Sequence, residues 1–123
     1  MGDLLDEGII FFNCGRFFEA HEAWEDLWRQ ESGGRKLFYQ GLVQAAVALH
    51  HLSKSNRVGA QAQLEKSISK LDQYASDEAG LDVVRLRREL RQVLERLEVA
   101  ATAEVRIVRL KRDLDVVESG GTG

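Results

Sequence analysis

The sequence contains no proline, a single cysteine and no long apolar run. Without proline, its turns must be marked by glycine, serine and asparagine. Cys14 cannot form an internal disulfide, so a reducing compartment is expected. No apolar stretch approaches the about 18 residues that a membrane helix needs. The acidic N-terminus has the wrong charge for a secretory signal. We therefore expect a cytoplasmic protein that does not cross a membrane.

Charge is unevenly distributed along the 123 residues, whose net charge is −3. Residues 1–31 carry eight acidic residues against two basic ones, whereas residues 85–112 carry nine basic residues against four acidic ones. Such polarity is typical of a solvated helix face, of a domain with an anionic partner, or of head-to-tail association. The arginines have few aromatic residues between them and match no nucleic-acid motif, so no nucleic-acid partner is expected. They are Arg85, Arg87, Arg88, Arg91 and Arg96.

Apolar periodicity predicts an all-α fold, a compact bundle of about five helices. The third helix is apolar almost all round, which is typical of a central, buried helix. We expect the first four helices to form two antiparallel hairpins and the fifth to close the bundle. The predicted helices span residues 3–14, 16–31, 35–53, 55–74 and 81–99.

A faint internal repeat relates the second and fourth helices at a spacing of 40 residues. A small residue followed by large ones, one and two turns later, lets helices pack closely, as in tetratricopeptide-like pairs. His21 aligns with Gln61, so the repeat does not account for the histidine. The aligned pairs are Ala20 with Ala60, Trp24 with Leu64, Glu25 with Glu65, and Trp28 with Ile68.

Residues 104–117 fit two patterns. They alternate as in a strand, yet Ile107, Leu110, Leu114 and Val117 also have helical spacing. Because the preceding segments are helical, we predict a helix here. One helical domain is expected over residues 1–118, followed by a disordered tail at 119–123.

The aromatic residues of the first two helices are predicted to form the core. Cys14 precedes a helix-ending glycine and has no catalytic context, so it is predicted to be a small buried residue. The predicted core aromatics are Phe11, Phe12, Phe17, Phe18, Trp24 and Trp28.

Five polar side chains lie on helix faces that should be apolar. Three aromatic residues of the second helix lie within about 60° of His21, and Glu25 lies about 40° to the other side of it. Gln40, Gln44 and His51 form a narrow stripe on the third helix. An unpaired buried polar group costs about 1–3 kcal/mol. Antiparallel packing of the two helices therefore predicts that His21 approaches His51.

Two motifs occur in order, FFEAHExxExxWR at residues 17–29 and QGLxQ at residues 40–44, with a histidine at position 51. Over about residues 5–74, the chain resembles domain of unknown function 309, a family of small all-helical microbial proteins. The resemblance implies an all-α fold and brings no established activity, substrate or cofactor. It also implies that His21, Glu25, Gln44 and His51 belong to the family pattern. The fifth helix and the C-terminal segment, residues 80–118, carry no motif of the family.

The first functional hypothesis is an interaction or ligand-binding domain. Its inward polar cluster is then structural or binds one small polar group, with Gln40 and Gln44 as the contacts. A related hypothesis is a structural partner of another protein, bound through the basic fifth helix. A protein partner, a small polar ligand and a homo-oligomer are all compatible with the sequence.

The alternative hypothesis is a metal-dependent hydrolase. His21 and Glu25, one turn apart, and His51 from the facing helix supply three ligands for a divalent metal ion and leave an open position. Glu22 is the candidate general base and Arg29 the candidate anchor for an anionic group. Whether the protein is an enzyme stays open at this point.

Overall fold

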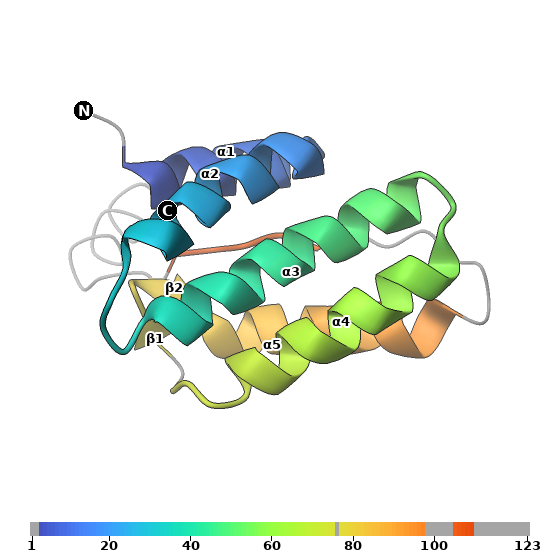
Figure 1. The fold of residues 1–123 in the computed structure, drawn as a ribbon. Coiled ribbons are helices and arrows are strands. Elements are labelled where there is room, and N and C mark those ends of the chain that lie inside the picture. The colour runs from blue at the N-terminus through green and yellow to red at the C-terminus, as the bar shows by residue number, and fades with distance from the viewer. Residues whose placement is uncertain (1–2, 76, 98–104, 110–123) are drawn as a thin grey trace, which may run out of the picture.

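The computed structural model describes residues 3–75, 77–97 and 105–109. Its five helices pack in order, each against the next one in the sequence, which confirms the predicted all-α bundle (Figure 1). None of the described helices is long and apolar enough to cross a membrane. The elements are α1 (Leu4–Asn13), α2 (Phe17–Gln30), α3 (Lys36–Ser53), α4 (Arg57–Leu71), β1 (Asp77–Glu78), β2 (Leu81–Asp82) and α5 (Val83–Arg96).

The spacing of 40 residues corresponds to two helical hairpins with the same turn. Gly15 lies between α1 and α2, and Ser55 lies at the equivalent place between α3 and α4. Both have a positive φ, 82° and 62° respectively. In each turn the amide of the following residue donates to the carbonyl five residues back, at 2.8 Å. The two turns therefore end α1 and α3 in the same way, by a left-handed residue that frees the chain to reverse.

Two of the four aligned pairs lie in the core. Ala20, Ala60, Trp24 and Leu64 are all fully buried. The indole Nε1 of Trp24 donates to the carbonyl of Leu5, at 3.2 Å, and so fastens α2 to α1. The small alanines allow the helices to approach, and the large side chains one turn later fill the space between them.

Two of the core predictions are wrong. Phe18 is 50% exposed, because adjacent helix residues point about 100° apart and Phe17 takes the inward position. Cys14 is exposed because it is the C-cap residue of α1, where the chain turns at the surface. Phe12 and Trp24 are buried, as predicted. The partly buried aromatics are Phe11, Phe17 and Trp28.

A short hairpin separates α4 from α5. Its two turn residues, Ala79 and Gly80, have φ values of 55° and 77°, the signs that a type I′ turn requires. This hairpin is not among the elements predicted from the sequence. The hairpin places the start of α5 beside residues 105–109, since Leu81 forms an isolated bridge with Arg109.

Residues 105–109 are extended, so the predicted helix is wrong there. Val105 and Ile107 are buried and Arg106 between them is exposed, which is the alternation of a strand. The Asn13 side chain donates to the carbonyl of Ile107 and accepts from its amide, both at 3.0 Å, which docks the segment on α1. Tertiary contacts thus decided between two patterns that the sequence allowed. Residues 104 and 110–117, and the predicted tail at 119–123, lie outside the described residues.

Candidate functional site

On α2, the carboxylate of Glu25 lies close to a histidine and to an arginine. Glu25 Oε1 lies 3.8 Å from His21 Nε2 and 3.2 Å from Arg29 Nη2. Arg29 also contacts Asp26 Oδ1 at 3.3 Å, and its side chain is 60% exposed. His21 and Glu25 are therefore neighbours, as predicted. The carboxylate is shared with an arginine on the surface.

His51 does not join this group. Its Nδ1 lies 3.2 Å from the Nδ2 amide of Asn56, at the turn between α3 and α4. Among the residues that the structure describes, no three His, Cys, Asp or Glu side chains lie close enough together to hold a metal ion. The proposed ligands His21, Glu25 and His51 are thus not brought together.

His50, rather than His51, faces α2. Its ring lies 5.7 Å from the ring of Phe18, which in turn lies 5.6 Å from that of His21. The neighbouring carboxylate of Glu19 accepts a hydrogen bond from Arg16 at 2.9 Å. That bond lowers the pKa of Glu19, and the charge of His50 adds a smaller effect in the same direction. Two imidazoles, an exposed phenyl ring and a carboxylate therefore share this part of the surface.

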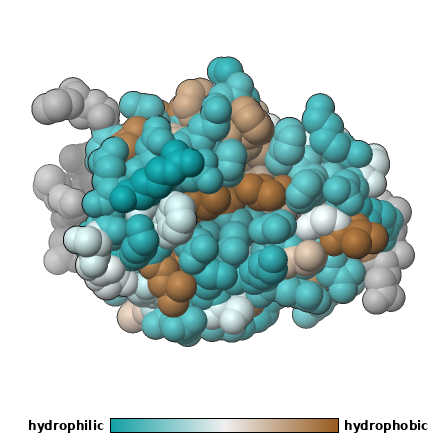
Figure 2. All heavy atoms as spheres, viewed as in Figure 1, coloured by the Kyte–Doolittle hydropathy of each residue, from teal (hydrophilic) through white to brown (hydrophobic). Residues whose placement is uncertain are grey.

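The two glutamines predicted as ligand contacts lie half-buried on α3. Gln44 Oε1 is buried and has no hydrogen-bond partner within the described ranges. Figure 2 shows a short apolar strip along α3 with hydrophilic residues on both sides. Glu22, the candidate base, is exposed on α2. The polar residues of α2 and α3 form a surface rather than an enclosed site.

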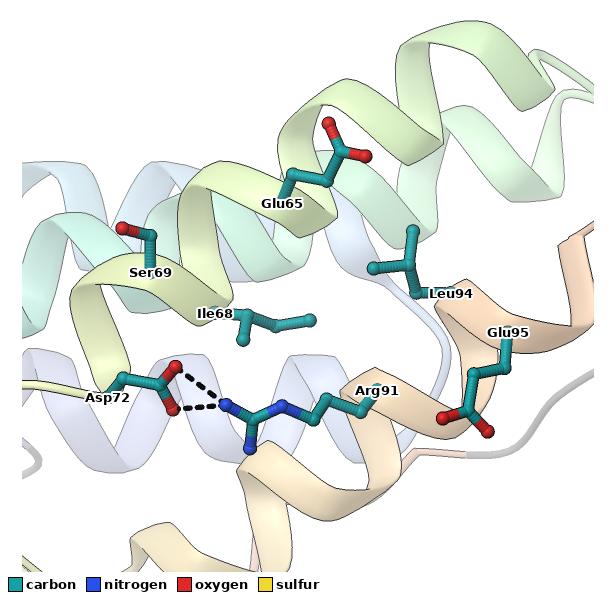
Figure 3. A pocket seen from close by; sticks show the side chains of 7 residues that line it. All are labelled: Glu65, Ile68, Ser69, Asp72, Arg91, Leu94 and Glu95. Atoms are coloured by element: carbon teal, nitrogen blue, oxygen red, sulfur yellow. Dashed lines mark hydrogen bonds and ion pairs between the residues drawn. The ribbon is translucent and has the colours of Figure 1, made fainter.

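A cleft of about 430 Å³ lies between α4 and α5 (Figure 3). Arg91 Nη2 donates to both carboxylate oxygens of Asp72, each at 2.6 Å, and this pair closes one end of the cleft. Ile68 and Leu94 supply apolar surface between the two helices. The remaining lining residues are Glu65, Ser69 and Glu95.

A second hollow, of about 380 Å³, lies along the outer side of α5. It shares Arg91 and Glu95 with the cleft, so the two are adjacent. We call Arg87, Arg88 and Arg91 the α5 arginine face. The exposed Val84 and Gln92 complete the lining.

The arginine face follows from the amphipathic pattern of α5. Its apolar residues Val83, Leu86, Leu90 and Val93 are buried, which leaves Arg88 and Arg91 exposed and Arg87 half-buried. The arginines themselves are evident from the sequence. The residues that line the hollow beside them all belong to α5. The exposed apolar Val84, next to a buried valine, was the signal that could have drawn attention to it.

Family comparison agrees with the two motifs. Residues 5–63 match the model of the family described as Domain of unknown function (DUF309). Over this segment the chain is similar to DUF309 proteins. The matched segment runs from α1 into α4, so α5 and its arginine face lie beyond it.

Two relatives extend this comparison past the DUF309 segment. Uncharacterized protein YpuF of Bacillus subtilis (strain 168) is 33% identical over 107 residues, which is 84% of this chain and 62% of that protein. An uncharacterized protein of Aquifex aeolicus (strain VF5) is 27% identical over 105 residues, 85% of this chain and 32% of that protein. The chain therefore spans less than two thirds of the length of either relative.

Proposed function

We propose that this protein is an interaction domain that binds an acidic segment of a protein partner on the α5 arginine face. The observation that carries the proposal is the hollow of about 380 Å³ in which three arginines and the exposed Val84 line one surface. Guanidinium groups bind carboxylates through paired, charge-assisted hydrogen bonds. Such a surface suits a partner that carries carboxylates beside an apolar side chain.

Two of the three arginines on the α5 arginine face can bind an incoming carboxylate. Within the described residues, Arg88 makes no ion pair. Arg91 is paired with Asp72, yet its side chain is 47% exposed, and a pair that exposed contributes only about 0–1 kcal/mol. An incoming carboxylate can therefore bind Arg88 directly and reach Arg91 from the solvent side. Arg87 is held more firmly, because it also donates to the carbonyls of Leu71 and Tyr74 at the end of α4, at 3.1 and 2.8 Å.

Apolar side chains on both sides of the arginines offer such a partner a further contact. Leu94 lines the cleft beside Arg91, and Val84 lies at the hollow on the other side. Arginine together with apolar side chains is the composition that protein interfaces favour. Both relatives continue beyond the region matched here, as expected for a domain that occurs within longer proteins.

A labelled peptide tests the proposal. The probe is a helical peptide with glutamate every three to four residues and leucine between, and its binding is measured by fluorescence anisotropy at low salt. We expect Arg88→Glu to weaken binding by at least about tenfold, since reversing a contacting charge is worth more than about 1.4 kcal/mol.

The matched control is Lys54→Glu, the same change of charge at an exposed position between α3 and α4. It should bind the peptide within about twofold of wild type. Equal binding by Arg88→Glu and wild type, or equal binding of a peptide with lysine in place of glutamate, would refute the arginine face as the site.

A further inference from the structure

The acidic surface that best matches the arginine face belongs to the protein itself. We infer that α2 of one copy docks on the α5 arginine face of a second copy; this inference rests on the proposed function. We call Glu19, Glu22, Glu25 and Asp26 the α2 acidic face. Both α2 and α5 are 14 residues long. α2 carries four acidic residues and one basic residue, net −3, while α5 carries five basic and two acidic residues, net +3.

The fold prevents these helices from meeting within one molecule. α2 packs against α1 and α3, whereas α5 packs against α4. Figure 1 shows α2 at the upper side of the bundle and α5 at the lower side. Each outer face is therefore turned away from the other, and only a second copy can bring the two charges together. Complementary potentials of this kind attract two molecules in a defined orientation.

Each of the two faces carries a charged side chain that is available for an ion pair between two copies. Glu22 is exposed on α2 and, like Arg88 on α5, forms no ion pair among the described residues. Glu22 and Asp26 are one turn apart, as are Arg88 and Arg91, so two pairs can form along adjacent turns. Within the described part of the chain, Asp26 is paired with Arg29 alone, at 3.3 Å and on the surface.

The association is expected to be weak and sensitive to salt. Each exposed ion pair contributes about 0–1 kcal/mol. The Debye length falls from about 30 Å at 0.01 M salt to about 3 Å at 1 M. Several pairs acting together at low salt are therefore needed to hold two copies. The apolar Val84, exposed beside the arginines, adds a contact that salt does not weaken.

Sedimentation velocity of the full chain tests the inference. Wild type should associate as concentration rises at about 0.02 M salt and should be monomeric at about 0.5 M, where screening is much stronger. Glu22→Arg and Arg88→Glu should each be monomeric at low salt. An equal mixture of the two variants should associate again, because one supplies an intact arginine face and the other an intact acidic face.

The mixture guards against a variant that merely misfolds, since only two folded partners can restore association. Glu7→Arg, an exposed change of the same sign on α1, should associate like wild type. A wild type that stays monomeric at low salt, while peptide binding still depends on Arg88, would overturn the self-partner and leave the proposed function standing. Self-association that neither Glu22→Arg nor Arg88→Glu reduces would also overturn the inference that α2 docks on α5. A wild type that neither associates with itself nor binds the peptide would refute both the inference and the proposed function.

Discussion

Gly8 is the position where the packing of α1 on α2 can be tested most sharply. A Cβ built on Gly8 would overlap Nε1 and Cε2 of Trp24 and lie 2.5 Å from Cδ1. The indole is fully buried, and it cannot move without breaking its hydrogen bond to Leu5. Gly8→Ala should therefore destabilise the fold, although alanine favours helices.

The magnitude follows from three contributions. Overpacking a buried site costs about 3 kcal/mol at the upper end of its range, which this overlap warrants. Loss of the indole hydrogen bond costs about 1 kcal/mol. Replacing glycine with alanine stabilises the helix by about 1 kcal/mol, which offsets part of this loss. The expected net loss is about 3 kcal/mol, or a Tm lower by about 10–15 °C.

Urea unfolding followed by far-UV circular dichroism measures this loss. The control is a double-mutant cycle with Trp24→Leu, which removes the ring that meets the new methyl group. In that background Gly8→Ala should cost at least about 1 kcal/mol less than in wild type. A Gly8→Ala variant as stable as wild type would show that α1 does not lie this close to the indole.

Three further results are expected. Ser55→Gly should stabilise the protein by about 0.5–1 kcal/mol in thermal unfolding, because Ser55 has a φ of 62° and the equivalent turn of the first hairpin uses glycine; a lower Tm would contradict this. Asn13→Ala should cost about 1–3 kcal/mol and speed amide exchange at Ile107, since both its hydrogen bonds fasten residues 105–109; unchanged exchange would refute that role. Arg16→Ala should raise the pKa of Glu19 toward its usual 4.5 in an NMR titration. Because the folded pKa is lowered, this pair stabilises the fold above the unfolded pKa, and the effect is lost as pH falls through the folded value; an unchanged Glu19 titration in the variant would contradict it.

Of the side chains predicted to meet, His21 and Glu25 lie close together and His51 does not join them, for a geometric reason. His21 and Glu25 meet because they are one turn apart on a single helix, which spacing alone determines. The contact between His21 and His51 required the rotation of α3 about its own axis to be known. His50 and His51 differ by about 100° around the helix. A modest error in rotation therefore exchanges which imidazole faces α2.

Tertiary packing sets that rotation. Gly41 lies against α4, where an added Cβ would come within 3.0 Å of Leu71 Cδ2. The buried hydroxyl of Ser67 donates to the carbonyl of Gly41 at 2.7 Å. These contacts turn one side of α3 toward α4 and bring His51 to the turn beside Asn56. His50 then faces α2, where it contacts Phe18.

The sequence by itself determined the five helices, their order and the two equivalent hairpins. These depend on local periodicity, on turn residues such as Gly15 and on short connections, all of which can be counted along the chain. Only the tertiary structure decided that residues 105–109 are extended, that Phe18 is exposed, and that His50 rather than His51 faces α2. Each of these depends on which surface a segment meets. Burial against distant residues can select either of two conformations that the local sequence permits equally.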